Sequence, residues 1–436
     1  MRVLIIGSGG REHAISWAMG QSPKVCKVIV SPGNSAMKET LPNLQIESVE
    51  ATNSAELLKL AIKEKVDLTI VGPEASLSSG IVDLFRENNL LIVGPTKAAS
   101  LLEASKAFAK KVMMDAKVPT AGFAEFFDAD LALKYIEESQ NQKMVVKCDG
   151  LAQGKGVVVC LSKNEARLAV IGFMKEQMLG ENVSHIIIEE YLEGMEVSAF
   201  ALCDGESFTF LGTACDHKRL KNNDQGPNTG GMGVYSPAAI VSEKDIEWMN
   251  ASVFKPMMTE MSKRGEAFSG ILFAGLMKTS SGWKVLEFNT RLGDPETQVL
   301  LPLMDEDILP WFLASAKGEI KKLQSELKRM SPKTKEMKAV HVVMAAHGYP
   351  GTEGVKVRTG DSVKIDSTFN LSPYDFLFMA GVEKNKNELK TKGGRVLGIT
   401  SMAVTYTFAR AKAYEYVSQI HFDGAQYRTD IGSGLL

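Results

Sequence analysis

Two oxygen ligands and one cation lie close together in the sequence, at Glu287, Asn289 and Arg291. In an extended segment, side chains two residues apart leave the same face, so these three should point together while Leu286 and Phe288 point to the opposite side. A carboxylate and an amide oxygen suit Mg²⁺, which keeps its remaining bonds for water and phosphate. The Arg291 guanidinium could then bind phosphate oxygens through paired hydrogen bonds. The segment therefore fits a triphosphate site, although a charged edge strand with a solvated turn explains it equally well when it is taken alone.

A glycine-rich turn at residues 7–10 lies between an apolar run and a helical pattern, where backbone N–H groups and the helix dipole favour an anion. Arg11 adds a positive charge, which suits a ribose phosphate better than the pyrophosphate of NAD. The dinucleotide fingerprint is incomplete, because Glu12 occupies its third glycine position and the second apolar run ends without an acid. We predict a phosphate site and disfavour a nicotinamide cofactor; a tight turn without a ligand is the alternative.

The segment at residues 147–156 (KCDGLAQGKG) lies between two β-branched runs and is predicted to form a hairpin. A Walker A loop is excluded, because Gly156 follows Lys155 where serine or threonine is needed, and more strand comes next. Lys147 could reach phosphate oxygens from the end of the first strand, while the glycines would let the loop close over a triphosphate as a lid. An ordinary surface hairpin with a lysine is the other interpretation.

A basic cluster at residues 216–219 (DHKR) precedes a flexible loop at residues 226–233 (GPNTGGMG). An isolated basic run is usually an exposed turn. The density of glycines beside this one favours a substrate-binding loop whose backbone can approach the ligand closely. We assign His217 no catalytic role, because a lone histidine is more often a structural hydrogen-bonding residue.

An apolar strand at residues 186–188 runs into an acidic turn that ends at Glu196. The backbone of such a connecting strand could offer donors and acceptors to a nucleotide base, with one acid free to bind ribose hydroxyls. Taken alone, this pattern fits a surface turn better.

The scaffold for these motifs begins with a hundred residues in which short apolar runs alternate with helical patterns, as in a parallel sheet with crossover helices. A glycine turn follows each predicted strand, so these turns should line one crevice at the carboxyl ends of the strands. The predicted strands are residues 3–6, 25–30, 67–71 and 91–93. A helix should follow from residue 105 to near Pro119, and the lysine-rich segment 321–338 is predicted to be a linker before a last domain.

Composition limits the classes of function. With 436 residues the chain can hold about three domains. Lys and Arg number 50 against 52 Asp and Glu, so no overall field would attract nucleic acid or a membrane surface. Five cysteines are scattered without a Cys-x-x-Cys pair, which argues against a disulfide framework or structural zinc. Neither a signal sequence nor a membrane-spanning run is evident, so we expect a cytoplasmic protein that acts on small molecules.

Five motifs, in this order, resemble the ATP-grasp ligases and, within them, the glycinamide ribonucleotide synthetase (phosphoribosylamine–glycine ligase) family. They are residues 9–14 (GGREHA), 147–152 (KCDGLA), 216–219 (DHKR), 226–233 (GPNTGGMG) and 291–298 (RLGDPETQ). The resemblance spans nearly the whole chain. It departs from the family pattern at Cys148 and Gln153, where alanine is expected, and at Leu292, where phenylalanine is common.

The resemblance implies an α/β fold with three domains. The first is an N-terminal parallel-sheet, Rossmann-like domain at residues 1–104 that binds phosphoribosylamine. The second is an ATP-grasp domain at residues 105–324, with a small hairpin lid at about residues 120–190. The third is a C-terminal α+β domain at residues 325–436, which is expected to cover the site.

The resemblance also implies the residues of the site. Lys106 and Lys147 would hold the ATP phosphates, and Arg291 and Lys147 would be catalytic. The metal, Mg²⁺ or Mn²⁺, would be bound by Glu287 and Asn289. The base would lie near Glu189, Tyr191 and Leu192, with the ribose on Glu196. The expected substrate contacts are Gly9, Gly10, Arg11, Glu12, Asp216, Lys218, Asn228, Gly230, Arg291 and Asp294.

The implied activity is ATP-dependent ligation of glycine to 5-phosphoribosylamine through glycyl phosphate, which gives glycinamide ribonucleotide, ADP and phosphate in de novo purine biosynthesis. We expect a monomer that makes transient contact with the enzyme supplying phosphoribosylamine. Three other classes are weighed against this. One is another ATP-grasp carboxylate–amine ligase, or a biotin-dependent carboxylase subunit, with a different acceptor. The others are an NAD(P)-linked oxidoreductase and a non-catalytic nucleotide-binding protein.

Overall fold

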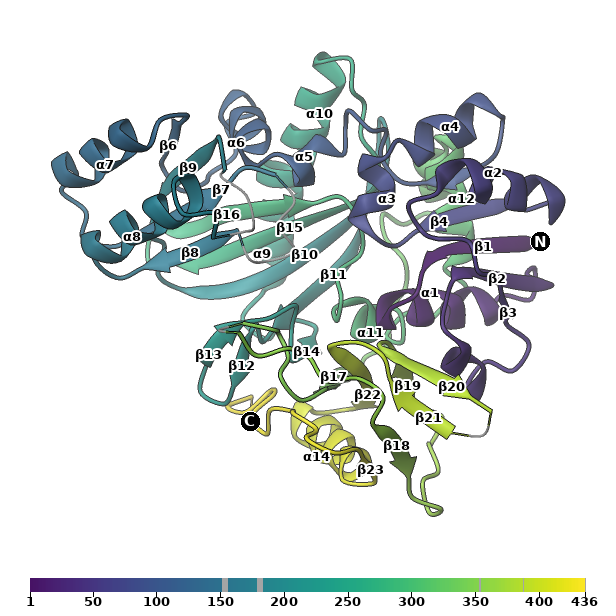
Figure 1. Cartoon of the computed structure of the whole chain (residues 1–436). Helices are drawn as coiled ribbons and strands as arrows, with labels where there is room; N and C mark the ends of the chain where they lie inside the picture. The colour runs from purple at the N-terminus through teal and green to yellow at the C-terminus, as the bar shows by residue number, and fades with distance from the viewer. Residues whose placement is uncertain (151–155, 179–182, 353, 387, 436) are drawn as a thin grey trace.

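The computed structural model describes residues 1–150, 156–178, 183–352, 354–386 and 388–435. Figure 1 shows an N-terminal region (purple) beside a large central sheet, a small lid region at the opposite end of that sheet, and a C-terminal region (yellow-green) below both. This arrangement confirms the predicted mixed α/β fold, with a parallel sheet at the N-terminus.

The N-terminal sheet is parallel, with strand order β3-β2-β1-β4-β5. Its strands are β1 (Arg2–Gly7), β2 (Lys27–Pro32), β3 (Gln45–Ile46), β4 (Leu68–Val71) and β5 (Ile92–Val93). Its helices are α1 (Gly10–Gly20), η1 (Ser35–Glu39), α2 (Ser54–Lys63), α3 (Glu74–Ser78) and α4 (Ile81–Glu87). The four predicted strands are confirmed, and their continuous apolar runs reflect burial on both faces. The additional strand β3 was not predicted, because two residues carry no periodicity.

A small antiparallel sheet forms the lid region, with strand order β6-β9-β7-β8. It is reached through α5 (Leu101–Ala104) and α6 (Lys106–Asp115), and its elements are β6 (Phe123–Phe126), α7 (Ala129–Glu138), β7 (Met144–Cys148), β8 (Val157–Cys160), α8 (Lys163–Met174) and β9 (Ile186–Glu190). The pairing of β7 with β8 confirms the predicted hairpin. Its tip at residues 151–155, predicted to close over the nucleotide, lies outside the described residues.

One continuous sheet joins the central region to the C-terminal region, with strand order β16-β15-β10-β11-β14-β17-β22-β19. The central strands are β10 (Met195–Asp204), β11 (Phe208–Asp216), β14 (Gly233–Ser236), β15 (Ser269–Thr279) and β16 (Gly282–Asn289). The C-terminal strands are β17 (Lys338–Ala345), β19 (Asp375–Met379) and β22 (Arg395–Ala403). Because β14 pairs with β17, the loop that precedes β14, which the sequence predicts to bind substrate, is fixed directly against the C-terminal region.

The remaining elements cover this sheet and extend its lower end. The central region adds the ribbon β12 (Arg219–Lys221) and β13 (Gln225–Asn228), followed by α9 (Glu243–Met249), the π-helix η2 (Asn250–Phe254), α10 (Lys255–Lys263), α11 (Thr297–Leu300), α12 (Leu309–Lys317) and α13 (Ile320–Leu327). The C-terminal region adds α14 (Tyr406–Val417) and a sheet of β20 (Val382–Asn385), β21 (Glu388–Thr391), β18 (Ser362–Ile365) and β23 (Ile420–His421).

The predicted linker at residues 321–338 is wrong in its first part, because α13 continues through it to Leu327. Ile320 and Gln324 are buried on one face of this helix, and Leu323 packs beside them against the core. The spacing of three to four residues is helical. The two lysines between these positions, Lys321 and Lys322, lie on the exposed face and made the segment read as polar.

Two buried histidines lie where the N-terminal and C-terminal regions meet. His13 Nδ1 accepts the Met379 N–H at 2.8 Å, and its Nε2 lies 2.9 Å from Thr40 Oγ1. His341 Nδ1 lies 2.8 Å from Thr400 Oγ1. Burial lowers the pKa of both histidines from 6.5 to about 3. Both are therefore neutral in the folded protein at physiological pH.

The depressed histidine pKa predicts that acid destabilises the fold. An unfolded histidine takes up a proton below about pH 6.5, whereas buried His13 does so only near 3. The stabilisation is thus present above pH 6.5 and is lost as the pH falls toward 3, by about 2 kcal/mol per histidine at pH 5. Urea unfolding at pH 7 and pH 5 measures the loss. His13→Gln should show a smaller loss between the two pH values than the natural protein; an equal loss contradicts the prediction.

Candidate active site

Glu287 and Asn289 lie at the end of β16, an edge strand of the large sheet. Phe288 between them is buried, while both ligand residues are partly exposed, as expected for side chains on opposite faces. Burial alternates along β16 on both sides of one interruption, where Leu286 and Glu287 are consecutive partly exposed residues. In the pairing with β15, Gly275 faces Glu287 and Leu276 faces Val285, so Leu286 is an extra, bulged residue. Bulges are common beside active sites because they change the direction of neighbouring side chains.

Lys147 comes from the lid region to the same place. Its Nζ lies 3.4 Å from the carbonyl oxygen of Leu286, the residue before Glu287, and 2.9 Å from Glu189 Oε1 on the adjacent strand β9. Burial would raise the pKa of Glu287, but nearby cations outweigh it and keep the pKa below its ordinary value. In falling order of effect they are Lys218, Lys147, Lys106 and Arg291. Four cations from separate segments therefore act on one ionised carboxylate.

Asp149 anchors the hairpin to the start of α6. It accepts hydrogen bonds from Ser105 Oγ, at 3.0 and 3.2 Å, and from the Ala107 N–H at 3.1 Å. Lys106, the first residue of α6, donates from Nζ to the Gly150 carbonyl at 3.0 Å. Lys106 is thus tied to the loop that follows β7, the strand that carries Lys147.

Lys218 and Glu196 form an ion pair beside Glu287. Burial would lower the pKa of Lys218, but Glu196, Glu287 and Asp216 together raise it, so this lysine stays charged. Asp216 lies close to this pair, at the end of β11. Burial and the charge of Glu296 raise its pKa well above the ordinary value, and its Oδ1 is buried without a hydrogen-bond partner among the described residues. An unpartnered buried oxygen of this kind could bind a donor group of a substrate.

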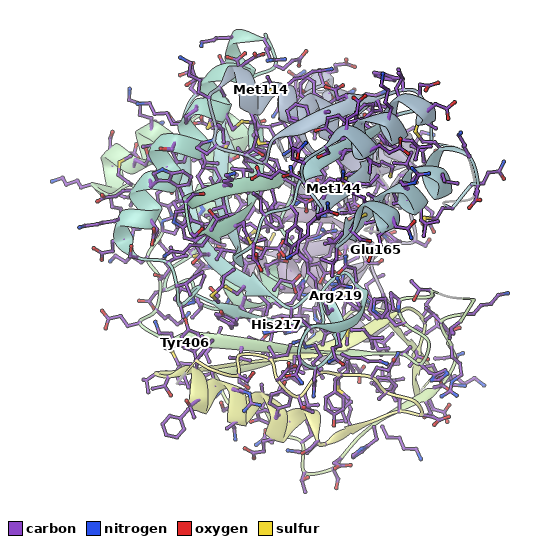
Figure 2. The ribbon with its side chains drawn as sticks, turned by 90° about the vertical axis from the view of Figure 1, so that its left-hand side faces the viewer. Met114, Met144, Glu165, His217, Arg219 and Tyr406 are labelled. Carbon is purple, nitrogen blue, oxygen red and sulfur yellow. The ribbon has the colours of Figure 1, made fainter. Side chains whose placement is uncertain are left out.

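His217 lies on the side of this cluster that faces the C-terminal region. Figure 2 shows His217 and Arg219 low in the central region, above the C-terminal ribbon that carries Tyr406. The His217 ring packs edge-to-face on Tyr235 at 5.9 Å, and Tyr235 packs in the same way on Tyr406 at 5.5 Å. Burial lowers the pKa of His217. A neutral ring in an aromatic stack agrees with the structural role expected for this residue.

Arg291 is held by two carboxylates of preceding segments. Its Nη2 lies 2.9 Å from Glu103 Oε1, and its Nε lies 3.4 Å from Glu74 Oε2. It reaches Asn289 Oδ1 only at 3.5 Å. Burial would lower the pKa of Arg291, but Glu103 and Glu74 raise it. The guanidinium is therefore fixed between the N-terminal turn that carries Glu74 and the end of β16.

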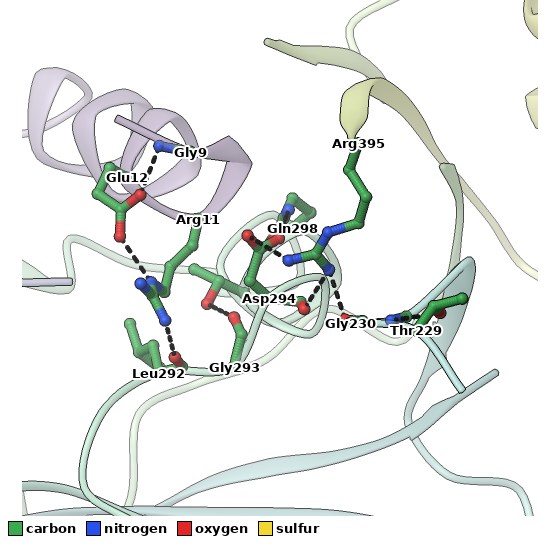
Figure 3. Close-up of polar contacts among 12 residues, drawn as sticks. Gly9, Arg11, Glu12, Thr229, Gly230, Leu292, Gly293, Asp294, Gln298 and Arg395 are labelled. Carbon is green, nitrogen blue, oxygen red and sulfur yellow. Dashed lines mark hydrogen bonds and ion pairs between the residues drawn. The ribbon is translucent and has the colours of Figure 1, made fainter. Parts of the chain in front are cut away.

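Asp294 and Gly230 are joined by an arginine of the C-terminal region, as Figure 3 shows. Arg395 Nη2 lies 3.0 Å from Asp294 Oδ2, Nη1 donates to the Asp294 carbonyl at 2.6 Å, and Nη1 also donates to the Gly230 carbonyl. Tyr349 Oη accepts the Gly230 N–H at 2.9 Å. Asn228 lies nearby in sequence, exposed at the end of β13. The C-terminal region thus closes over the substrate loop.

A methyl group at Gly231 should disrupt this loop. Gly231 has φ +108°, and a Cβ there would lie 2.5 Å from Pro295 Cδ and 2.6 Å from Asp216 Oδ1. Gly231→Ala should lower the free energy of unfolding by about 2 kcal/mol or more, through strain and overpacking. Gly265 is the matched control, because its φ is +81° but no atom lies within 4 Å of its Cβ position. Denaturant unfolding should show a smaller loss for Gly265→Ala; equal losses would mean that backbone strain alone is responsible.

The N-terminal turn is closed by its own residues. Glu12 is buried, accepts the Gly9 N–H at 2.7 Å, and lies 2.6 Å from Arg11 Nε. Arg11 Nη1 donates to the Leu292 carbonyl at 3.1 Å (Figure 3). A Cβ at Gly72, in the turn after β4, would lie 1.9 Å from Glu12 Oε1. The glycine turns after β1 and β4 therefore meet on Glu12, which places the predicted crevice beside residues 291–294.

The residues expected at the nucleotide base line one connection between β9 and β10. Glu189 and Leu192 are buried, and the Tyr191 ring lies under Lys143, with Nζ 5.2 Å from the ring centre. Glu196 follows on β10, paired with Lys218. Glu189, on β9, pairs with Lys147, whereas Tyr191 lies beside Lys143, just before the other end of β7.

Glu287 and Asn289 supply a donor set that fits a small hard cation. The carboxylate is ionised, the amide oxygen is engaged only by the 3.5 Å contact from Arg291, and both lie on one face of the strand. Among the described residues, no group of three or more His, Cys, Asp or Glu residues could hold a metal. Two protein oxygens suit Mg²⁺ or Mn²⁺, which would complete their coordination with water and phosphate oxygens.

Three side chains of this site were not predicted: Arg395, Glu74 and Glu103. Arg395 follows two glycines at the start of β22, a pattern similar to the glycine-rich motifs that predicted the other loops of the site. Glu74 lies in one of the glycine turns assigned to the crevice. Glu103 lies in a helical stretch without any motif, and only the fold brings it to Arg291.

Comparison with known proteins agrees with this geometry. Three family models match, described as the N domain (residues 1–103), the ATP-grasp (A) domain (residues 104–297) and the C domain (residues 339–434) of phosphoribosylglycinamide synthetase. The chain is 41% identical over 436 residues to the phosphoribosylamine–glycine ligase of Chlorobaculum tepidum, covering 100% of both chains. It is 41% identical over 440 residues to that of Ralstonia nicotianae, covering 99% of each.

Solved structures extend the comparison to the fold. The phosphoribosylamine–glycine ligase of Thermotoga maritima superposes with a TM-score of 0.83 and 31% identity, covering 99% of this chain and 100% of that one. The biotin carboxylase of Campylobacter jejuni gives 0.73 at 16% identity, covering 98% and 92%, which is a likeness of fold alone. Among the described residues, no helix has the length and apolar character needed to cross a membrane.

Proposed function

Because this chain belongs to the phosphoribosylglycinamide synthetase family, we propose that it ligates glycine to 5-phosphoribosylamine at the expense of ATP, in purine biosynthesis. The products are glycinamide ribonucleotide, ADP and phosphate. The observation that carries this conclusion is the convergence on Glu287 of Lys218, Lys147, Lys106 and Arg291, which come from separate segments. A cluster of this charge fits a triphosphate next to an ionised carboxylate.

The first step activates glycine. A glycine carboxylate resists an amine because it is negatively charged and its oxide is a poor leaving group. A carboxylate oxygen therefore attacks the γ-phosphorus of ATP, the bond to the β,γ-bridging oxygen breaks, and ADP leaves. Lys147 and Arg291 stabilise the charge that shifts during this transfer, and positioning supplies most of the remaining catalysis.

The second step forms the amide bond. The amine of phosphoribosylamine attacks the carbonyl carbon of glycyl phosphate, loses a proton, and phosphate leaves. No protein nucleophile is needed. Acyl phosphates hydrolyse, so water must be kept out. The hairpin of β7 and β8 on one side, and Arg395 and Tyr349 on the other, are the groups that we assign to closing the site.

We assign the individual residues as the family resemblance implies. ATP phosphates bind Lys106 and Lys147, the base binds at Glu189, Tyr191 and Leu192, and the ribose binds Glu196. The acceptor and glycine bind among Gly9, Gly10, Arg11, Glu12, Asp216, Lys218, Asn228, Gly230, Arg291 and Asp294. A divalent metal, Mg²⁺ or Mn²⁺, would be held by Glu287 and Asn289, where it would neutralise phosphate charge.

We also propose the domain limits as residues 1–104, 105–324 and 325–436, with the lid at about residues 120–190. The continuous sheet across the last boundary supports a C-terminal domain that is fixed against the central one. A cytoplasmic monomer with transient contact to the enzyme that supplies phosphoribosylamine completes the proposal. Sedimentation of the purified chain tests the monomer directly.

ADP release tests the reaction. It is measured with each amino acid in turn and with phosphoribosylamine generated in place. Strict need for glycine and phosphoribosylamine together supports the proposal. Equal ADP release with another acceptor would assign the chain to a different carboxylate–amine ligation. ADP release that depends on neither glycine nor phosphoribosylamine would contradict ligation altogether.

A further inference from the structure

A second buried lysine lies behind the predicted nucleotide site. Lys110 Nζ lies 3.2 Å from Glu189 Oε2, while Lys147 Nζ lies 2.9 Å from Glu189 Oε1. All three side chains are at most 8% exposed. One carboxylate therefore joins two lysines, but only Lys147 reaches the edge of the site, at the Leu286 carbonyl.

Lys110 has no free donor with which to bind a ligand. Besides Glu189, its ammonium donates to Thr120 Oγ1 at 2.8 Å and to the Ala121 carbonyl at 3.3 Å, which accounts for its three N–H groups. Thr120 in turn donates to the Val285 carbonyl at 2.6 Å, so this lysine is tied to β16 as well. Lys110 can therefore act on the reaction only through the groups that it holds, of which Glu189 is the one that also contacts Lys147.

The lysine pair decides which hydrogen bonds Glu189 can make. Both lysine ammonium groups are donors and lie on the two Glu189 oxygens, so the pair orients this carboxylate as a hydrogen-bond acceptor. Burial lowers the pKa of Lys110 to about 8, so it is still mainly charged at neutral pH. Glu189 Oε1 is buried without a well-aligned hydrogen bond, despite its ion pair with Lys147. It keeps a lone pair for a ligand.

We propose that Lys110 is a positioning residue that fixes Glu189 as a hydrogen-bond acceptor for the nucleotide base, so that the site takes a 6-aminopurine and rejects a 6-oxopurine. Adenine offers an N–H donor at this position, whereas hypoxanthine offers a carbonyl oxygen, which a carboxylate repels. The inference rests on the proposed function, because it assumes that the base lies at Glu189. It adds to that function the group that sets the choice of base.

The test compares ATP with inosine triphosphate in the ADP- or IDP-release assay. Lys110→Met keeps the approximate length of the side chain. It leaves Glu189 paired with Lys147 alone, so one buried carboxylate faces one buried ammonium group. Loss of one charged contact should lower the preference for ATP over inosine triphosphate, measured as the ratio of kcat/KM values, about tenfold. The KM for ATP should rise, while kcat and the KM for glycine stay within about twofold. Lys110→Arg, which retains the charge, should restore most of the preference.

Lys111 is the matched control. It is the next residue on α6, but it is exposed and pairs with Glu125 at 3.0 Å, away from Glu189. Lys111→Met should leave the base preference unchanged. An unchanged preference in Lys110→Met, or an equal change in Lys111→Met, overturns the proposal. If Lys110→Met does not fold, Lys110→Gln takes its place under the same criteria. Glycine-dependent ADP release by the natural protein tests the proposed function separately, whatever the variants show.

Discussion

Replacing Arg291 by alanine should lower the glycine-dependent rate of ADP release by about a hundredfold to a thousandfold, with a much smaller change in the KM for ATP. The guanidinium is held between Glu103 and Glu74, so it is oriented before any ligand arrives. A cation that is already in place stabilises the charge of the moving phosphoryl group without reorganisation. Steady-state rates at saturating ATP, together with ATP titrations, separate the two effects.

Two further variants separate the charge of Arg291 from its anchoring. Arg291→Lys keeps a charge but loses the fork that spans both carboxylates, so we expect it to recover only part of the rate. Glu103→Gln keeps Arg291 but weakens its hold, and it should lower the rate less than Arg291→Ala does. Parallel losses of rate and of ATP affinity in Arg291→Ala would assign this residue to ground-state binding instead.

Local sequence patterns were enough to predict the strands and the hairpin, because their apolar or β-branched runs are visible in short segments. The runs that became β1, β2, β4 and β5 are apolar because both faces of a parallel sheet are covered, and the β7–β8 hairpin showed as β-branched runs around glycines. The α13 helix was missed because its few buried positions alternate with lysines, glutamate and serine, which made the whole segment read as polar. Sequence alone also gave no sign that β14 and β17 would join two regions into one sheet, since that pairing depends on residues far apart in the chain.

The candidate site likewise has features that the sequence predicted and features that it could not predict. Spacing alone placed Glu287 and Asn289 on one face, but the bulge at Leu286 was not predictable, because it depends on register with β15. Lys147 was chosen from its place at the end of a strand, whereas the choice of Lys106, and of Glu196 among the acids of its turn, came from family resemblance. Partners such as Glu103 for Arg291 and Arg395 for Asp294 follow from tertiary packing. These contacts hold the motif residues in place, but a sequence motif does not show which residues will form such contacts.

Glu287→Ala should raise the concentration of Mg²⁺ needed for half-maximal activity at least tenfold, because it removes the only charged ligand of the proposed donor pair. The cations around Glu287 keep its pKa below the ordinary value, so the requirement of the natural protein should not change between pH 6 and pH 8 through titration of this group. Magnesium titrations of ADP release at fixed ATP measure both quantities. Glu287→Asp, with a shorter reach, should fall between alanine and the natural protein.

The control for Glu287 is a carboxylate of similar type outside the cluster. Glu190 lies on β9, is largely exposed, and pairs with Lys284 at 3.1 Å. Glu190→Ala should leave the magnesium requirement unchanged, because its carboxylate faces a lysine on the outer part of β16 and has no oxygen ligand beside it. If Glu287→Ala and Glu190→Ala both kept the natural requirement, the metal would have to bind elsewhere. The charge of Glu287 would then serve only to balance the charges of Lys218 and Lys147 at the proposed phosphate site.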